Sequence, residues 1–383
     1  MIVLEERSVV AEKRDLRAVA EALVSDLAAR AEAHDAEDSF VADGYARLRE
    51  AGLIEAGAPA ALGGGGAEVR ELADMLRVLA HGCGSTALAF AMHTHQVAIP
   101  AWRWTHRQVA AVEPLLRRVA SERIVLLSSG GSDWIGGSGR AEKVEGGWRV
   151  DARKVFTSGA EAGDVLMTSA VVEEDGARSV IHFGAPMKAA EVRIADNWRT
   201  LGMRGTGSND VVLDGLFVPD AAVALRRPAG EWHPLFQIIA TIAFPLIYAV
   251  YLGVAESARD IAVEMARKKP ATPHLLDLAG RMDTALRAAQ IAHGAMVAAA
   301  ERNDPSAQSV NEVMIGRTLV AENAIAATTL ALELAGGAGF YRAAGLERRF
   351  RDVQGARYHP LQAGPQAAYA GAMALGLPVD RIF

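Results

Sequence analysis

Residues 201–219 read LGMRGTGSNDVVLDGLFVP, and this stretch decides how the middle of the chain is interpreted. Its first half is rich in Gly, Ser, Asn and Asp, residues that favour turns and loops. Its second half, Val211–Phe217, is dominated by β-branched and other apolar residues and is followed directly by Val218-Pro219. A polar loop that leads into such a run predicts a β-strand, and the proline predicts that the β-rich segment ends there.

Four segments upstream have the same character. Each is short, contains many β-branched residues and is bounded by Gly, Asp, Asn or Pro, as strands of an antiparallel sheet often are. These segments are residues 124–129, 147–151, 165–172 and 179–183. Together with 211–217 they predict a central antiparallel β domain over residues 121–225.

The regions on either side of the predicted strands have helical periodicity. Apolar side chains recur at helical spacing over about 8–30, 40–51, 68–81 and 85–102, and Ala-rich helices with Leu/Ile stripes are predicted at 238–268, 274–303, 306–336 and 365–375. The predicted fold class is therefore α+β. We expect an N-terminal helical domain over 1–120, the β domain over 121–225 and a C-terminal helical bundle over 226–383.

The overall composition excludes several classes of protein. A chain of 383 residues with 51% hydrophobic and 22% charged residues forms a large core. The net charge of −6 and the absence of clustered Lys and Arg argue against a nucleic-acid partner. The single cysteine, Cys83, excludes an internal disulfide and fits a reducing compartment. The charged N-terminus and the lack of a long apolar run predict a cytoplasmic protein without a membrane span.

Four stretches resemble motifs of the acyl-CoA dehydrogenase superfamily and follow one another in the order found in that family. They are the Gly-rich loop at 52–66, the pair 128–133 and 147–159, the quoted stretch 201–219, and Gly336-Gly-Ala-Gly-Phe-Tyr-Arg followed by Leu346-Glu-Arg-Arg-Phe-Arg-Asp352. The resemblance implies a helical domain, an antiparallel β-barrel or sandwich and a C-terminal four-helix bundle. It also implies a homotetramer or homodimer that binds a flavin, either FAD, FMN or a diffusible reduced flavin.

The resemblance places the flavin against two loops of the β domain. A flavin ring needs nearby backbone N–H groups and small residues that let the backbone approach. The implied flavin contacts are Ser128, Ser129 and Ser132, with Ser132 at the pyrophosphate; Phe156, Thr157 and Ser158 at the ring; and Glu333, Gly336 and Gly337 at the far end of the cofactor. Ordinary hairpin turns are the alternative interpretation of the two loops.

The glutamate base of a true dehydrogenase is missing from both positions that the family uses. Dehydrogenases need a carboxylate to remove the α proton of the thioester. The position that follows the Arg-Asp pair holds Pro360 here, preceded by His359, and the position on the first bundle helix offers Gln237 but no acid. The family's Arg-x-x-Phe-Gly loop is also absent from 267–273. These departures resemble the superfamily's monooxygenase branch, which uses reduced flavin and O2.

Matching positions in that branch imply catalytic roles for His359, Ser158 and His95, which would form and protect a hydroperoxyflavin. Arg204 and Trp134 are the candidates for substrate contact. Each has a structural alternative: a histidine can pack or cap, a serine beside glycine can serve a turn, and an arginine can form a salt bridge. No metal site is predicted, because His95 and its neighbour two residues earlier lack a carboxylate at ligand spacing.

Three functions remain open from the sequence. The first is a monooxygenase that acts on an aromatic, heterocyclic or amine substrate, with flavin reduced by a separate reductase. The second is an acyl-CoA dehydrogenase that has a displaced base, for which Glu161 is a candidate. The third is a non-catalytic member that binds flavin or another ligand, since a fold does not fix a function. The first two also require a small-molecule substrate and an electron-transfer partner.

Overall fold

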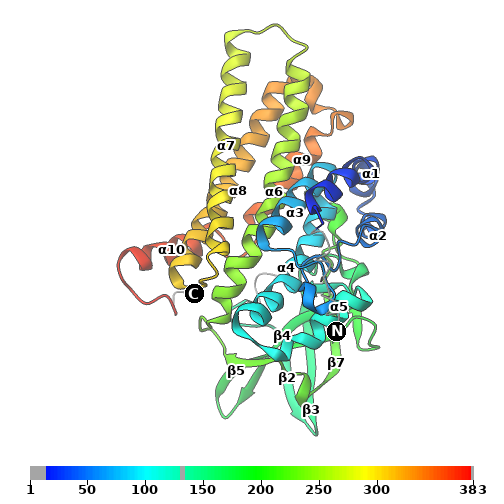
Figure 1. The fold of residues 1–383 in the computed structure, drawn as a ribbon, viewed down its shortest axis with the longest axis vertical. Coiled ribbons are helices and arrows are strands. Elements are labelled where there is room, and N and C mark those ends of the chain that lie inside the picture. The colour runs from blue at the N-terminus through cyan, green and yellow to red at the C-terminus, as the bar shows by residue number, and fades with distance from the viewer. Residues whose placement is uncertain (1–13, 130–133, 381–383) are drawn as a thin grey trace, which may run out of the picture.

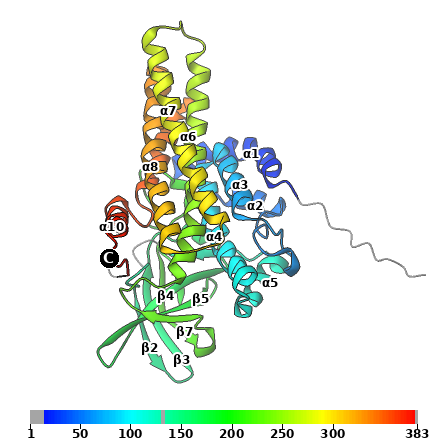
Figure 2. The same ribbon diagram turned by 60° about the vertical axis from the view of Figure 1, so that its left-hand side comes forward.

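A computed structural model describes residues 14–129 and 134–380. Figures 1 and 2 show a β-sheet at one end of the molecule and long helices that extend away from it. The N-terminal helices pack along one side of these long helices, mainly through α3 and α4 against α6. The helix–sheet–helix order predicted from the sequence is therefore confirmed.

From residue 14 onward, the N-terminal part contains five α-helices. They are α1 (Leu16–Glu37), α2 (Ala42–Glu50), α3 (Val69–Gly82), α4 (Gly84–Arg107) and α5 (Glu113–Glu122). Asp15 caps α1, since its side chain accepts hydrogen bonds from the first turn of the helix. A reciprocal capping box between Glu68 and Glu71 begins α3. Helix α4 is buried along most of its length, so it forms the centre of this part.

The central part is one eight-stranded sheet. Its strands are β1 (Leu126–Ser128), β2 (Arg140–Val144), β3 (Gly147–Lys154), β4 (Val165–Glu174), β5 (Ala177–Pro186), β6 (Val192–Ile194), β7 (Val211–Pro219) and β8 (Leu225–Pro228). The order is β6-β7-β3-β2-β4-β5-β8, with β1 also paired to β4. The prediction of a purely antiparallel sheet is wrong for two pairs, because β1 and β2 both run parallel to β4. The long segment between β1 and β4 provides the crossover that a parallel pair requires.

Strand β7 is the second half of the stretch 201–219. Its side chains alternate between the core and solvent, with Val211 and Leu213 buried. The alternation shifts at Gly215, which has a φ of 69° and belongs to a bulge of β7 where Asp214 and Gly215 lie opposite Asp151 of β3. Glycine tolerates this left-handed conformation without strain, so the strand can keep an apolar face toward the core on both sides of the bulge.

The C-terminal part contains α6 (Leu235–Ala266), α7 (Pro273–Glu301), α8 (Ala307–Ala335), α9 (Leu346–Val353) and α10 (Ala363–Ala374). The three long helices pack against one another, and the two short helices both pack against α8. The sequence predicted four helices here and missed α9. Glycines with positive φ, Gly336 and Gly345, flank the irregular segment that separates α8 from α9.

Two apolar helices in the C-terminal part require a correction to the sequence analysis. Residues 235–255 contain no Asp, Glu, Lys or Arg, so α6 does reach membrane-spanning length and apolarity, as does the segment 307–340. In α6, however, 89% of the apolar window is buried inside the protein. Packing between the N-terminal helices and the bundle therefore accounts for the apolar character of α6.

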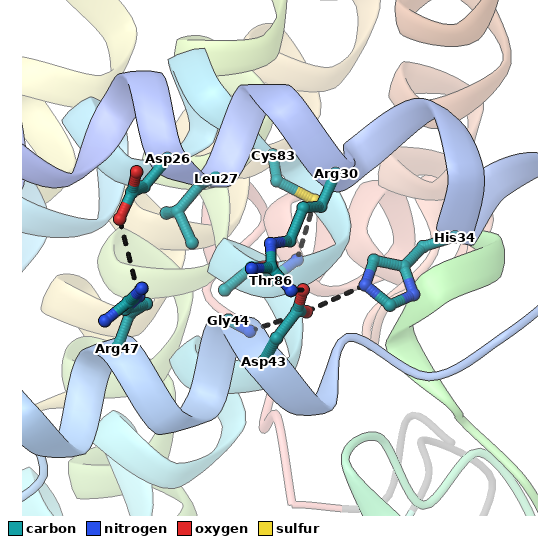
Figure 3. A pocket seen from close by; sticks show the side chains of 9 residues that line it. All are labelled: Asp26, Leu27, Arg30, His34, Asp43, Gly44, Arg47, Cys83 and Thr86. Atoms are coloured by element: carbon teal, nitrogen blue, oxygen red, sulfur yellow. Dashed lines mark hydrogen bonds and ion pairs between the residues drawn. The ribbon is translucent and has the colours of Figure 1, made fainter.

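A small hollow between α1, α2 and the start of α4 is lined by charged side chains (Figure 3). Asp43 on α2 lies 2.7 Å from an Arg30 nitrogen and 2.8 Å from Nε2 of His34, both on α1. Arg47 forms a second ion pair with Asp26 at 3.4 Å. These contacts hold the two helices together at the surface.

The linker that precedes β7 packs closely against α9. The backbone N–H of Met203 donates to the carboxylate of Asp352 at 2.5 Å. A Cβ atom added at Gly202 would lie 2.3 Å from the backbone carbonyl group of Arg351. Arg351 itself forms ion pairs with Asp35 on α1 at 2.6 Å and with Glu347 at 2.6 Å. This junction joins all three parts of the chain.

We predict that Gly202→Ala destabilises the protein, because the new methyl group collides with backbone that cannot rotate away. The expected loss is about 1–3 kcal/mol of unfolding free energy, visible as a lower Tm in thermal denaturation. Gly294→Ala on α7 is the matched control, since no atom lies within 4 Å of the added Cβ. An equal Tm for the two variants would contradict the close contact at this junction.

Candidate functional site

The loop after β3 presents few groups to a ligand. Phe156 has a φ of 55° and a ring that is 54% exposed, and this ring packs edge-on against Trp198 at 5.8 Å. Thr157 is fully buried, and its hydroxyl donates to the carbonyl of Lys154 at 3.2 Å. The backbone N–H groups of residues 157, 158 and 159 all donate to carbonyls of the protein. The sequence predicted that such N–H groups are available to a flavin. In the structure they donate hydrogen bonds to backbone carbonyls of the protein instead.

The hydroxyl of Ser158 belongs to a buried chain of hydrogen bonds. Its Oγ lies 2.8 Å from Oγ of Ser208, which lies 2.6 Å from Oγ1 of Thr206. Thr206 in turn donates to the carbonyl of Met203 at 2.8 Å. The first half of the stretch 201–219 therefore lies directly behind the loop that carries Ser158.

The first predicted flavin loop is described only in part. Ser128 ends β1 and is partly exposed, and the hydroxyl of Ser129 is hydrogen-bonded to Thr168 at 3.0 Å. Ser132 lies outside the described residues. Beneath this region, the amine of the buried Lys154 donates to the carbonyl and the hydroxyl of Ser138, both at 2.9 Å.

His95 and His359 lie close enough for the charge of His95 to affect the pKa of His359, although the two residues are far apart in the sequence. Nδ1 of His95 donates to the carbonyl of Ala91 at 3.0 Å, which leaves Nε2 as an acceptor. Nε2 of His359 lies 2.7 Å from the hydroxyl of Tyr251. Burial lowers the pKa of His95 to about 4, with a smaller contribution from His93. Burial also lowers the pKa of His359 to about 3, with further contributions from Arg317 and His95.

The turn that carries His359 is fixed by a buried arginine on α8. Arg317 donates to the carbonyls of Ala356 at 3.1 Å and of His359 at 3.0 Å. Its guanidinium group lies over the ring of Tyr248 at 5.2 Å, and the hydroxyl of Tyr248 donates to Ala356 at 2.7 Å. Buried polar groups with several partners are rigid, so the imidazole of His359 is held in one orientation.

A row of aromatic side chains connects Trp134 to this histidine. Trp134 packs edge-on against Trp232 at 5.4 Å and against Phe244 at 5.8 Å. Phe244 contacts Tyr248 at 6.5 Å, and Tyr248 contacts His359 at 6.2 Å. Trp134 and His359 therefore pack at the two ends of one row of aromatic side chains along α6, and their contact with a substrate stays a prediction.

The remaining predicted residues lie elsewhere. Arg204 donates to the carbonyl of Thr200 at 3.0 Å and lies 3.6 Å from the carboxylate of Asp38, so structural contacts account for its charge. Glu333, Gly336 and Gly337 are exposed at the end of α8. Their roles in binding stay predictions. The described residues contain no group of three or more His, Cys, Asp or Glu side chains that could hold a metal ion.

The contacts of His93 explain why His93 and His95 form no metal site. Its Nε2 donates to the carbonyl of Ile54 at 2.8 Å, and its Nδ1 accepts from the backbone N–H of Leu126 at 3.0 Å. Both ring nitrogens are therefore used: Nδ1 joins α4 to β1, and Nε2 joins α4 to Ile54 in the segment after α2. Burial lowers the pKa of His93 to about 4, so the ring is neutral at pH 7.

The sequence analysis missed three residues of this site: Tyr248, Tyr251 and Arg317. The tyrosines are three positions apart on α6, which places them on one face of the helix, and this spacing could have indicated their association. The sequence around Arg317 contains no comparable signal. Its function depends on carbonyl groups of the turn near residue 356, which the sequence does not locate.

Comparison with known proteins identifies the family of this chain. Its residues 11–116 match the N-terminal domain of acyl-CoA dehydrogenase and residues 246–362 match the C-terminal domain. The chain therefore belongs to the acyl-CoA dehydrogenase family, and it is a flavin-dependent oxidoreductase.

Three relatives illustrate the range of this similarity. The amino sugar nitrososynthase DnmZ of Streptomyces peucetius is 28% identical over 91% of this chain and 90% of its own. The cyclohex-1-ene-1-carbonyl-CoA dehydrogenase of Geobacter metallireducens is 26% identical over 82% of this chain and 84% of its own. The structure of KijD3 in complex with FMN and a dTDP-linked amino sugar has a TM-score of 0.86 and 26% identity, and covers 96% of this chain and 95% of KijD3.

The neutral histidines predict a dependence of stability on pH. The folded pKa of His93 is lower than its unfolded value of about 6.5, so the unfolded state binds a proton first on acidification. Below pH 6.5 each such histidine lowers the unfolding free energy by up to about 1.4 kcal/mol per pH unit, until its folded pKa is reached.

We expect His93→Gln to reduce this pH dependence between pH 6.5 and 4 by the contribution of one proton, measured by urea unfolding at several pH values. His274→Gln, at an exposed position on α7, is the control and should leave the dependence unchanged. Identical pH profiles for His93→Gln and the unmodified protein would show that His93 is protonated in the folded state.

Proposed function

We propose that the protein is a monooxygenase that uses reduced flavin and O2. One oxygen atom would enter the substrate and the other would leave as water, while the reduced flavin supplies two electrons and two protons. The observation that carries this proposal is the neutral His359, which is held by Tyr251 and directly precedes the position where the family's glutamate base is expected. With its pKa lowered to about 3, this imidazole is a poor base for removing an α proton at neutral pH.

The residues present fit a flavin ring. Phe156 offers an exposed aromatic face beside Ser158, whose oxygen faces no N–H or O–H donor in the described part of the chain apart from Ser208. His95 and His359 would form the substrate side, where two neutral imidazoles and aromatic side chains exclude water. Their role would be to orient the substrate and to keep charged groups away from the flavin ring. Charged groups near the ring would promote loss of the activated oxygen by proton transfer.

We propose FMN as the preferred flavin. The cofactor's adenosine half would meet the end of α8, where Glu333 carries a negative charge and is exposed. Lys269, the nearest cation, already donates to the carbonyls of Leu334 at 3.0 Å and Ala335 at 2.7 Å. The loop 267–273 also lacks the family's Phe-Gly pair. Glu333 therefore adds a negative charge at the end of the molecule where a second phosphate would need positive charge.

We further propose that the substrate is a small molecule with an oxidisable amine. Support comes from the amino sugar nitrososynthase and from KijD3, whose structure holds FMN and an amino sugar. Subunits would associate through the outer face of α7 and α8, which exposes Leu276, Ile291 and Leu319. A separate reductase would supply the reduced flavin, and the enzyme would be cytoplasmic.

An acyl-CoA dehydrogenase is the second candidate, favoured by one observation. Glu161 follows the Ser158 loop directly, accepts a hydrogen bond from Asn209 at 3.0 Å, and has its pKa raised by partial burial. A carboxyl group with a raised pKa can act as a base near neutral pH.

The two functions make opposite predictions under anaerobic conditions. A dehydrogenase reduces its own flavin when it meets a suitable thioester, whereas a monooxygenase receives flavin already reduced. We expect butyryl-CoA and octanoyl-CoA to leave the absorbance of the FMN-loaded protein unchanged. With a flavin reductase, NADH and ¹⁸O2, we expect mass spectrometry to detect ¹⁸O in the product formed from a dTDP-linked amino sugar.

Bleaching of the flavin by either thioester would overturn the proposal. In that case Glu161→Gln tests the displaced base, because loss of bleaching with unchanged flavin binding would assign the α proton to this carboxylate. Glu173→Gln, at an exposed position on β4, is the matched control.

The proposed preference for FMN can be tested by one substitution. We expect FMN to bind more tightly than FAD in titration calorimetry, and we expect Glu333→Gln to improve the Kd for FAD by about threefold to tenfold by removing repulsion of the pyrophosphate. The Kd for FMN should be unchanged, since FMN lacks the adenosine half. Equal effects on both flavins would contradict the placement of Glu333.

A further inference from the structure

Three hydroxyl groups and one carbonyl form an unbranched row behind the loop that carries Ser158. The separations are 2.8 Å between Ser158 and Ser208, 2.6 Å between Ser208 and Thr206, and 2.8 Å between Thr206 and the carbonyl of Met203. The three side chains are buried, with exposures of 7%, 4% and 0% in that order. Oxygen atoms this close in a buried setting require a hydrogen atom between each pair.

The direction of every hydrogen bond in this row follows from counting protons. A carbonyl oxygen only accepts, so the single hydroxyl proton of Thr206 points toward Met203. Ser208 must then supply the proton between itself and Thr206. Since that uses the only proton of Ser208, Ser158 must donate to Ser208. The proton of Ser158 is therefore directed inward, and its remaining lone pairs can only accept.

The backbone around the row maintains this direction. The carbonyl of Met203 also accepts from the indole N–H of Trp198 at 3.1 Å and from the backbone N–H of Thr206 at 3.1 Å. The backbone N–H of Gly159 donates to the carbonyl of Thr206 at 2.8 Å, which fixes the two loops against each other. Because this carbonyl has no proton of its own, the proton between it and the Thr206 hydroxyl must come from Thr206, and this sets the direction of the whole row.

We propose that Thr206 and Ser208 are positioning residues that make Ser158 an obligate hydrogen-bond acceptor, so that this loop favours the reduced form of the flavin. Reduction converts acceptor nitrogens of a flavin ring into N–H donors. An acceptor-only hydroxyl stabilises a donor but leaves an acceptor opposite it unsatisfied, which costs binding energy. This inference rests on the proposed function, because it requires a flavin at the Ser158 loop.

The test compares the affinity of the protein for oxidised FMN and for FMN reduced by dithionite under anaerobic conditions. We expect the unmodified protein to bind the reduced form more tightly. Ser208→Ala removes the acceptor of the Ser158 proton, so that the hydroxyl can rotate and donate to the oxidised ring. The ratio of the two Kd values should then shift toward the oxidised form by about tenfold, the usual effect of one hydrogen bond.

Matched variants separate this effect from a loss of packing. Thr206→Val keeps the shape of the side chain but removes its hydroxyl, so it should shift the ratio in the same direction as Ser208→Ala. Thr206→Ser keeps the hydroxyl and should preserve the ratio. Ser257→Ala, a buried serine on α6 whose hydroxyl donates to the carbonyl of His81 at 3.3 Å, should also leave it unchanged.

The outcomes for the proposed function and for this inference are distinct. An unchanged Kd ratio in Ser208→Ala and Thr206→Val, with FMN bound normally, would overturn the inference and leave the proposed function standing. Failure of the unmodified protein to bind FMN in either form would overturn both. The expected shift in these two variants, together with an unchanged ratio in Thr206→Ser, would establish the role of the row.

Discussion

The peptide groups on the two sides of Met203 hold the candidate site together. The N–H of Met203 donates to Asp352 on α9, and its carbonyl accepts from Thr206 at the end of the row of hydroxyl groups. Asp352 is buried, and burial raises the pKa of its carboxyl to about 6. The carboxylate is retained in this position because it satisfies a buried N–H that would otherwise lack a partner. The C-terminal helices are thereby connected to the loop that carries Ser158 through a single residue of the linker.

The opposite side of the site depends on a second buried polar contact. Arg317 on α8 binds carbonyl groups of the turn that follows α9, and Tyr251 on α6 binds the imidazole of His359. Two helices of the bundle therefore fix a histidine that lies in an irregular segment. Removal from solvent keeps this imidazole and that of His95 neutral, so neither histidine adds charge to the site at neutral pH. Such a setting suits chemistry in which oxygen is transferred without a strong base.

The order of the helices and most of the strands could be predicted from the sequence because their periodicity is local. The strands that were missed, β2, β6 and β8, are short, and β2 and β8 are rich in charged residues, so pairing with neighbouring strands rather than composition defines them. The parallel pairing of β1 with β4 could not be predicted either. The direction of this pairing depends on which strands become neighbours in the folded protein. The sequence of one strand does not indicate the direction of the strand beside it.

The candidate site was predictable only where motifs resemble those of the family. Ser158 and His359 were identified in this way, and the structure places each beside polar partners. The partners themselves were not identified, because Tyr251 and His359 are 108 positions apart and no local pattern connects them. For Ser158, the string Arg204-Gly-Thr-Gly-Ser208 was recognised as similar to the monooxygenase branch, but the direction of its hydrogen bonds depends on distances that only the fold provides. Arg204 had two interpretations, and its contacts with Thr200 and Asp38 match the structural one.

The account rests on the claim that the Ser158 loop and the His95–His359 pair are two sides of one flavin site. A crystal structure of the protein with bound FMN tests this claim most directly. We expect electron density for the flavin ring beside Phe156, with the Ser158 oxygen within hydrogen-bond distance of a ring nitrogen. Both histidines should lie on the opposite side of the ring. Density for the ring away from Phe156, or a ring without contact to Ser158, would contradict it.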